Sequence, residues 1–237
     1  MMRPDEMVAA VELRDIALRL GRAWALRGVT LRIASGEMVA IHGHNGSGKT
    51  SLLRVIATAL RPNRGHGSVY GLDLVRDANA IRACCSLLTH GTGLYGDLTA
   101  AENLEFAQRM NGDPVNAAAI EHALNRVGLG GGVARQRVRT FSSGMQRRAA
   151  LARLFLRQHP LLLLDEPYNS LDPEGRRIVD ELLFDVNSQG GSAIVVLHDL
   201  EQSGVVFDMT VELQAGRVGQ VLRRADSDSR RAVAALA

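Results

Sequence analysis

The segment Gly43–Thr50, GHNGSGKT, lies between the short apolar run 38–42 and the helical pattern 50–60. It matches G-x-x-x-x-G-K-[ST], in which glycines allow backbone N–H groups to close around phosphate oxygens. The start of the following helix adds a partial positive charge at the same place. An ordinary glycine-rich turn is the alternative, but the strand before it and the helix after it favour a phosphate-binding loop.

Lys49 is the only lysine of the chain. Lysine and arginine together number 28, so the other 27 are arginines. A compact ammonium fits where a planar guanidinium would clash. We therefore expect Lys49 to reach the β- and γ-phosphates of a nucleotide, and Thr50 to offer its hydroxyl to Mg²⁺. The loop residues expected to bind this nucleotide are Gly43, His44, Asn45, Gly46, Ser47, Gly48, Lys49, Thr50 and Ser51.

A second apolar run, Leu161–Asp165, ends in a carboxylate and is followed by Glu166. Ligands of open α/β sheets collect at the carboxyl ends of the strands. Asp165 is therefore predicted to hold the water shell of Mg²⁺, and Glu166 to orient or deprotonate an attacking water. Alone, this pattern also fits a strand followed by two solvated acids. Together with the Lys49 loop, it favours a catalytic site.

Apolar strand patterns alternate with helical patterns along the chain, which predicts a parallel sheet covered on both faces. Between about 97 and 157, alanine, leucine, glutamate and arginine recur at helical spacing. The predicted fold is α/β: a P-loop NTPase core with a mainly parallel sheet, a small antiparallel β-subdomain and an inserted helical subdomain. The predicted ranges are 8–220 for one domain, about 88–157 for its helical part and 221–237 for a polar, alanine-rich tail. Strands are expected within 11–33, 38–42, 85–89, 161–165, 193–198 and 211–216, a turn and a short strand within 65–74, helices within 50–60, 75–83 and 173–188, and breaks at 111–114 and 128–132.

The composition narrows the possible settings. No apolar run approaches the roughly 18 to 20 residues that cross a bilayer, so a membrane role is expected to need a partner. The adjacent Cys84 and Cys85 cannot staple a fold, which indicates a reducing compartment and two core residues. The net charge of +3 is only weak evidence for nucleic acid or an anionic surface as a partner.

The segment FSSGMQRR resembles the signature motif of ABC ATPases, L-S-G-G-Q. Ser142 and Gly144 keep the family residues, whereas Phe141, Ser143 and Met145 replace them. The segment lies after the loop and before the acid pair, in the order of the family, and the resemblance spans roughly residues 11–217. It implies that ATP is bound between two subunits, with the signature residues Ser142, Ser143, Gly144 and Met145 contacting it across the interface.

Other positions also resemble this family. Asn169–Asp172 looks like the D-loop, which in the family crosses the dimer, and His198 matches the switch histidine that contacts the γ-phosphate. Two positions depart from the pattern. His90 stands where the family carries glutamine, and could hold a magnesium-bound water. Leu20 stands where an aromatic ring stacks on adenine; Trp24 is either its substitute or a buried structural residue.

The resemblance implies an ATP-binding and ATP-hydrolysing subunit that powers an ABC membrane transporter, an exporter, with ATP and Mg²⁺. Its expected partners are an integral membrane permease subunit and a second ATP-binding subunit in a homodimer. Its expected location is cytoplasmic, on the inner face of the cell membrane. His90, ALRGVTL and the SSGM form resemble the ATP-binding subunit of the cytochrome c maturation system, a heme exporter.

Two other functions are weighed against this one. A soluble ABC ATPase acting on nucleic acid or ribosomes is favoured by the basic run Arg135–Arg157. It is disfavoured by the single ATPase cassette and by the lack of a cysteine-pair zinc site, so no direct nucleic-acid contact is expected. A regulatory ATP binder that does not hydrolyse is disfavoured by Glu166 and His198.

Overall fold

The computed structural model describes residues 9–157 and 160–224. Its described residues form two compact units. The first contains those within 1–87, 159–166 and 186–237, and the second those within 88–158 and 167–185. Most of the tail predicted at 221–237 lies outside the described residues, from 225 onward.

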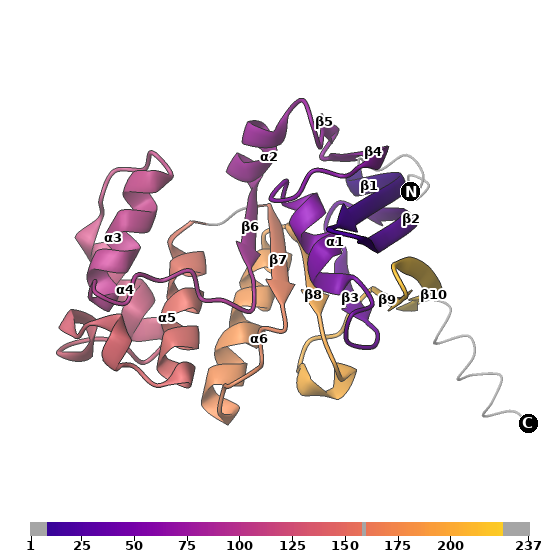
Figure 1. Cartoon of the computed structure of the whole chain (residues 1–237). Helices are drawn as coiled ribbons and strands as arrows, with labels where there is room; N and C mark the ends of the chain where they lie inside the picture. The colour runs from indigo at the N-terminus through magenta and orange to yellow at the C-terminus, as the bar shows by residue number, and fades with distance from the viewer. Residues whose placement is uncertain (1–8, 158–159, 225–237) are drawn as a thin grey trace, which may run out of the picture. The chain divides into compact units, whose positions relative to one another are not determined.

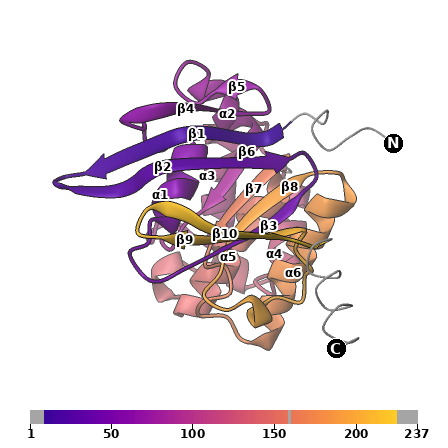
Figure 2. The same ribbon diagram turned by 90° about the vertical axis from the view of Figure 1, so that its right-hand side faces the viewer.

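The first unit contains an antiparallel sheet with the strand order β2-β1-β4-β5. Figure 2 shows β1 and β2 as a long hairpin with β4 beside β1. Apolar and charged residues alternate in part along β1, where Val11 and Leu13 are buried and Arg14 is exposed, as one covered face requires. The strands are β1 (Ala9–Leu20), β2 (Ala23–Ala34), β4 (Arg64–Val69) and β5 (Leu72–Asp73).

A second sheet has the order β10-β9-β3-β8-β7-β6. The pairs β3–β8, β3–β9 and β7–β8 are parallel, and β9–β10 is antiparallel. Every residue of β7 and β8 is buried, as expected for central parallel strands. The strands are β3 (Met38–His42), β6 (Cys85–Leu88), β7 (Leu161–Asp165), β8 (Ser192–Val196), β9 (Met209–Gln214) and β10 (Arg217–Arg223). The predicted α/β class with a mainly parallel sheet and a small antiparallel sheet is confirmed.

Helix α1 (Lys49–Ile56) packs against β7, β8 and β2, so its apolar face joins both sheets into one core. It ends four residues before the predicted limit at 60. Thr58 takes a left-handed φ of 56°, and its amide donates to the carbonyl of Val55 at 3.0 Å, which closes the helix. Helix α2 (Ala78–Cys84) and the short η4 (Leu200–Gln202) complete the described elements of this unit.

The second unit is helical. Helices α3 (Ala100–Met110), α4 (Ala117–Arg126) and α5 (Ser143–Leu156) pack on one another (Figure 1). A capping box between Thr99 and Glu102 starts α3, which fixes where the helix begins. The predicted breaks at 111–114 and 128–132 are confirmed. Short 3₁₀ helices η2 (Val133–Arg135) and η3 (Val138–Thr140) precede α5, and α6 (Pro173–Ser188) begins in this unit.

Two features of the first unit bear on the sequence predictions. Strand β10 was not predicted, because RVGQVLR carries no clear apolar alternation. The side chain of Cys85 is buried, and burial raises the pKa of its thiol to about 12. That thiol therefore stays protonated, as expected for a core residue.

Candidate functional site

The loop from Gly43 to Gly48 joins β3 to α1 in the first unit and presses against neighbouring backbone. Gly43 and Gly48 have φ values of 144° and 104°. A Cβ atom at Gly43 would overlap the carbonyl oxygen of Leu213, and one at Gly48 would lie 2.5 Å from that of Ala25. Both positions therefore need glycine for φ and for space.

Lys49 is the first residue of α1, and its side chain bends back over the loop. It is 6% exposed, and its Nζ donates to the carbonyls of Gly43 at 2.7 Å and His44 at 3.0 Å. Burial lowers the pKa of its ammonium, while the carboxylates of Glu166 and Asp165 act in the opposite direction. A positive charge is thus held inside the loop, close to two carboxylates.

The loop is tied to the β9–β10 turn and encloses one unusual hydroxyl. Gly216 donates its N–H to the carbonyl of Ser47 at 2.9 Å. The Ser47 Oγ is buried and, within the described part of the chain, has no hydrogen-bond partner. A buried hydroxyl of this kind is costly unless something binds it. The loop therefore fits an oxygen-rich ligand such as a phosphate.

Two acids and a histidine meet beside β7 and β8. Asp165 is the last residue of β7 and is 2% exposed. Glu166 has a left-handed φ of 50°, and its N–H donates to the carbonyl of Val196 at 3.1 Å. Its Oε1 lies 2.7 Å from Nε2 of His198, which follows β8 by two residues rather than ending it. Positive φ at a non-glycine residue is strained and typical of functional sites.

A cavity of about 460 Å³ brings together much of the predicted site in the first unit. Both Leu20 and Trp24, the alternatives for the adenine position, lie in its wall. The guanidinium of Arg64 sits over the Trp24 ring, 5.9 Å from its centroid. Trp24 is 37% exposed, so it is not a buried structural residue. The cavity is lined by Leu20, Ala23, Trp24, Ala25, the residues 45–51 and Glu166.

The predicted signature residues lie in the second unit, at the start of α5. Ser142 is the N-cap, and its Oγ accepts the N–H of Met145 at 3.2 Å. Together with Ser143, Gly144 and Asp172, these residues line a cavity of about 530 Å³. The family resemblance predicts that the signature residues and Asp172 lie at one interface, and in the second unit they line one cavity.

Asp172 is held by two hydrogen bonds. Its Oδ1 accepts from Arg148 Nη2 at 2.6 Å and from the N–H of Gly175 at 2.9 Å. These contacts keep the pKa of its carboxyl below the ordinary value. Neither arginine of the pair 147–148 was singled out from the sequence, because their partners lie far along the chain.

His90 lies in the second unit too, whereas Thr50 and Asp165 lie in the first. His90 is exposed and lines a cavity of about 390 Å³ with Gln146 and Asn169. Its assignment as a metal ligand therefore stays a prediction.

The residues of the first unit fit Mg²⁺ bound together with phosphate and water better than a metal ion whose ligands all come from the protein. In the part of the chain that the structure describes, no group of three or more His, Cys, Asp and Glu residues could hold a metal ion. Mg²⁺ commonly binds one or two protein ligands and takes other oxygens from phosphates and water. The Asp165 carboxylate and the Thr50 hydroxyl fit that donor set.

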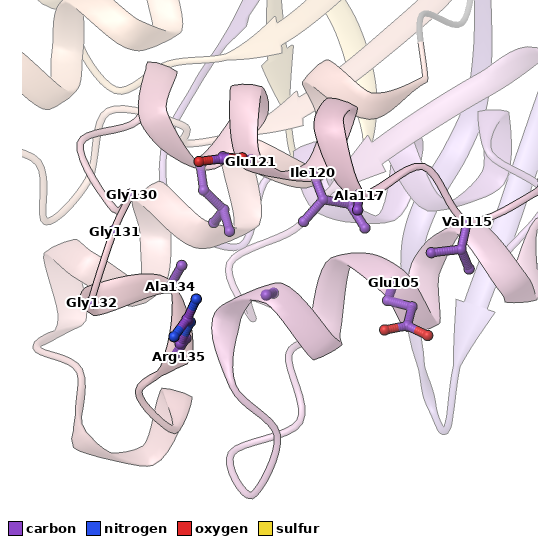
Figure 3. Close-up of a pocket in the computed structure, with 12 residues that line it drawn as sticks. Glu105, Val115, Ala117, Ile120, Glu121, Gly130, Gly131, Gly132, Ala134 and Arg135 are labelled. Carbon is purple, nitrogen blue, oxygen red and sulfur yellow. The ribbon is translucent and has the colours of Figure 1, made fainter.

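A further cavity, of about 540 Å³, lies in the second unit and contains none of the predicted site residues (Figure 3). Its wall comes from α3, Val115 before α4, α4 itself and the segment 130–135. It is mostly lined by small and apolar residues, with Glu105, Glu121 and Arg135 as the charged ones.

Among the described residues, no helix is long and apolar enough to span a membrane.

Comparisons with known proteins show the family of the chain. The ABC transporter family model matches residues 26–169. A cytochrome c biogenesis ATP-binding export protein of Cupriavidus metallidurans is 39% identical, covering 86% of this chain and 97% of that protein. A daunorubicin resistance ATP-binding protein of Streptomyces coeruleorubidus is 36% identical, covering 88% of this chain and 66% of that protein.

Solved structures support the fold. A dimeric bacterial ABC transporter cassette superposes with a TM-score of 0.80 at 24% identity, covering 90% of this chain and 98% of that one. The chain therefore belongs to the ABC transporter family, as an ATP-binding and ATP-hydrolysing component that powers a membrane transporter.

Proposed function

We propose that the loop 43–51 holds the phosphates of ATP, with Lys49 on the β- and γ-phosphates and Trp24 against the adenine ring. The shared cavity of about 460 Å³ supports this assignment, since loop, tryptophan and Glu166 line it together. Thr50 and Asp165 would hold Mg²⁺, with His90 as a further candidate through a bound water. When bound, the ion neutralises phosphate charge and fixes the γ-phosphate for attack.

The observation that carries the proposal is the 2.7 Å contact between Glu166 Oε1 and His198 Nε2. Glu166 orients the attacking water and accepts its proton. His198 keeps that carboxylate in place and reaches the γ-phosphate. A base oriented by a second side chain is the arrangement that proton abstraction requires.

The second unit supplies the other half of the site, to a second copy of the chain. Ser142, Ser143, Gly144 and Met145 contact the γ-phosphate of the partner copy, and Asp172 lies at the same interface. The pairing is a two-fold homodimer with two ATP sites. Support comes from the open cavity at the start of α5 and from the dimeric form of a similar cassette. We assign 8–220 to one ATPase domain, with a helical part at about 88–157.

The dimer powers an integral membrane permease from the cytoplasmic face of the membrane, and the transport is export. Its cargo pathway is cytochrome c maturation, as suggested by the 39% identical export protein, of which the alignment covers 97%. The 36% identical daunorubicin resistance protein represents the competing cargo class, a small hydrophobic drug. Neither relative supports action on nucleic acid.

Deleting the gene in its host separates the two cargo classes. Covalently bound heme of c-type cytochromes should disappear, and return with the wild-type gene but not with Lys49→Ala. Normal c-type cytochromes together with drug sensitivity would move the assignment to drug export. Purified Lys49→Ala should also bind ATP at least about tenfold more weakly than wild type; unchanged affinity would contradict the phosphate assignment.

A further inference from the structure

Arg147 is a charged side chain inside the second unit. It lies on α5 and is 4% exposed. A buried guanidinium is tolerated only when its donors are satisfied. Its Nη1 donates to the carbonyl of Thr89 at 2.7 Å, and its Nε to the carbonyl of Pro167 at 3.4 Å. One side chain therefore binds two backbone segments that are far apart in the sequence.

Both carbonyls stand next to residues of the proposed reaction. Thr89 directly precedes His90, and Pro167 directly follows Glu166. Both also lie within two residues of a point where the chain passes from one unit to the other, at 87–88 and at 166–167. The carbonyl of Thr89 shares a rigid peptide plane with the amide of His90, so its displacement moves His90 directly. The carbonyl of Pro167 shares one with the amide of Tyr168, so it anchors the start of the segment that follows Glu166.

The segment after Thr89 is held elsewhere as well. Arg153 Nη1 donates to the carbonyl of Gly93 at 3.4 Å. The buried Asn103 of α3 accepts the N–H of Tyr95 at 2.7 Å and donates to the carbonyl of Thr99 at 2.9 Å. The segment 89–99 is thus fixed to α5 at its start and to α3 at its end, so a movement of α5 is passed to it.

The fork geometry explains why this position carries arginine. Nε and Nη1 lie on one rigid plane and donate from two separate atoms, whereas a lysine ammonium would have to reach both acceptors from one nitrogen. The adjacent Arg148 serves other segments: it bonds Asp172 and Glu174 at 2.6 and 3.1 Å. Two neighbouring arginines of α5 therefore hold separate parts of the chain.

We infer that Arg147 is a positioning residue of ATP hydrolysis: it makes the His90 segment and the segment that leaves Glu166 respond together to helix α5. This inference rests on the roles proposed above for Glu166, His90 and the start of α5. Closure of a second copy on Ser142 and Ser143 would then reach both segments through one side chain. The shared cavity of His90, Arg147 and Asn169 places these groups around one space.

The test uses the full chain with Arg147→Lys and Arg147→Gln. Arg109→Lys is the matched control, since Arg109 is an exposed arginine of α3 whose ion pair within the described residues is with Glu105, one turn away on the same helix. We expect kcat to fall at least about tenfold in both Arg147 variants while KM for ATP stays within about twofold, because positioning is lost and the phosphate loop is not. Arg109→Lys should match wild type in both constants.

Hydrogen exchange supplies a readout that does not depend on turnover. In Arg147→Lys, amides of 89–92 and of 168–170 should both exchange at least about fivefold faster, and in Arg109→Lys neither should. Exchange that changes in only one segment or in none, or an Arg147→Lys kcat within twofold of wild type, overturns the inference. Wild-type turnover in Glu166→Gln would instead overturn the proposed role of Glu166, and would leave the exchange result standing.

Discussion

Glu166 Oε1 and His198 Nε2 lie 2.7 Å apart, although 32 positions separate the two residues in the chain (198 − 166 = 32). The parallel pairing of β7 with β8 brings them together, since Asp165 pairs with Val196 and both residues follow within two positions. Glu166 itself has a left-handed φ of 50°, which is strained for a residue other than glycine. The contact therefore follows from register, and it gives the carboxylate a fixed direction.

Replacing Glu166 by glutamine should lower kcat at least about 100-fold, because the amide cannot accept the proton of the attacking water. ATP affinity should stay within about twofold, since the phosphate loop is untouched. Phosphate release and equilibrium binding measure the two quantities. A variant that keeps more than half of the wild-type kcat would remove Glu166 from the mechanism.

His198→Ala should lower kcat by about 100-fold, the usual effect of losing one preorganised donor. His122→Ala is its control, because His122 is an exposed histidine of α4. That control should keep the wild-type kcat. Equal kcat values for the two variants would show that the contact with Glu166 has no role in turnover.

Gly43→Ala should destabilise the fold more than Gly46→Ala. At Gly46 the added Cβ meets nothing within 4 Å and only the φ of 77° is unfavourable, which costs about 1–2 kcal/mol. At Gly43 the Cβ also overlaps the Leu213 carbonyl, and the loss should exceed about 3 kcal/mol. Urea unfolding of both variants measures the difference; equal losses would contradict the close packing.

The pKa of Asp172 lies below its ordinary value of 3.8, chiefly because of Arg148 and then the N–H of Gly175. A lowered carboxyl pKa contributes stability above the unfolded-state value, and that contribution disappears as pH falls through the folded-state value. Asp172→Asn should therefore be less stable than wild type near neutrality, and the gap should close below pH 3.8. Thermal melting along a pH series tests this; a gap independent of pH would contradict it.

The parts of the site that were predicted from sequence are those formed by contiguous residues. The loop 43–50 and the pair Asp165–Glu166 are contiguous, so residue type and spacing were enough. The pairing of Arg147 with Thr89 and Pro167 joins residues 58 and 20 positions apart and has no local signal. The early end of α1 depends on the φ of Thr58, which helix propensity does not report. Strand β10 depends on its partner β9, since RVGQVLR alone carries no clear apolar alternation.

The residue that contacts adenine could not be chosen from the sequence alone. The family pattern pointed to Leu20, and composition pointed to Trp24. Both side chains line the same cavity. The β1–β2 hairpin pairs Arg19 with Trp24 and Leu20 with Ala23, which places the two candidates at one end of the hairpin. Sequence spacing could not reveal this, because register decides it.

The central claim is that the start of α5 in one copy closes on ATP held by the other. The mass of Glu166→Gln in solution, by light scattering with and without ATP, tests it most directly. We predict that ATP doubles the mass from the 25.6 kDa of one chain, and that adding Ser143→Arg at the exposed start of α5 abolishes the doubling. A mass that stays at 25.6 kDa while ATP is bound would contradict the claim.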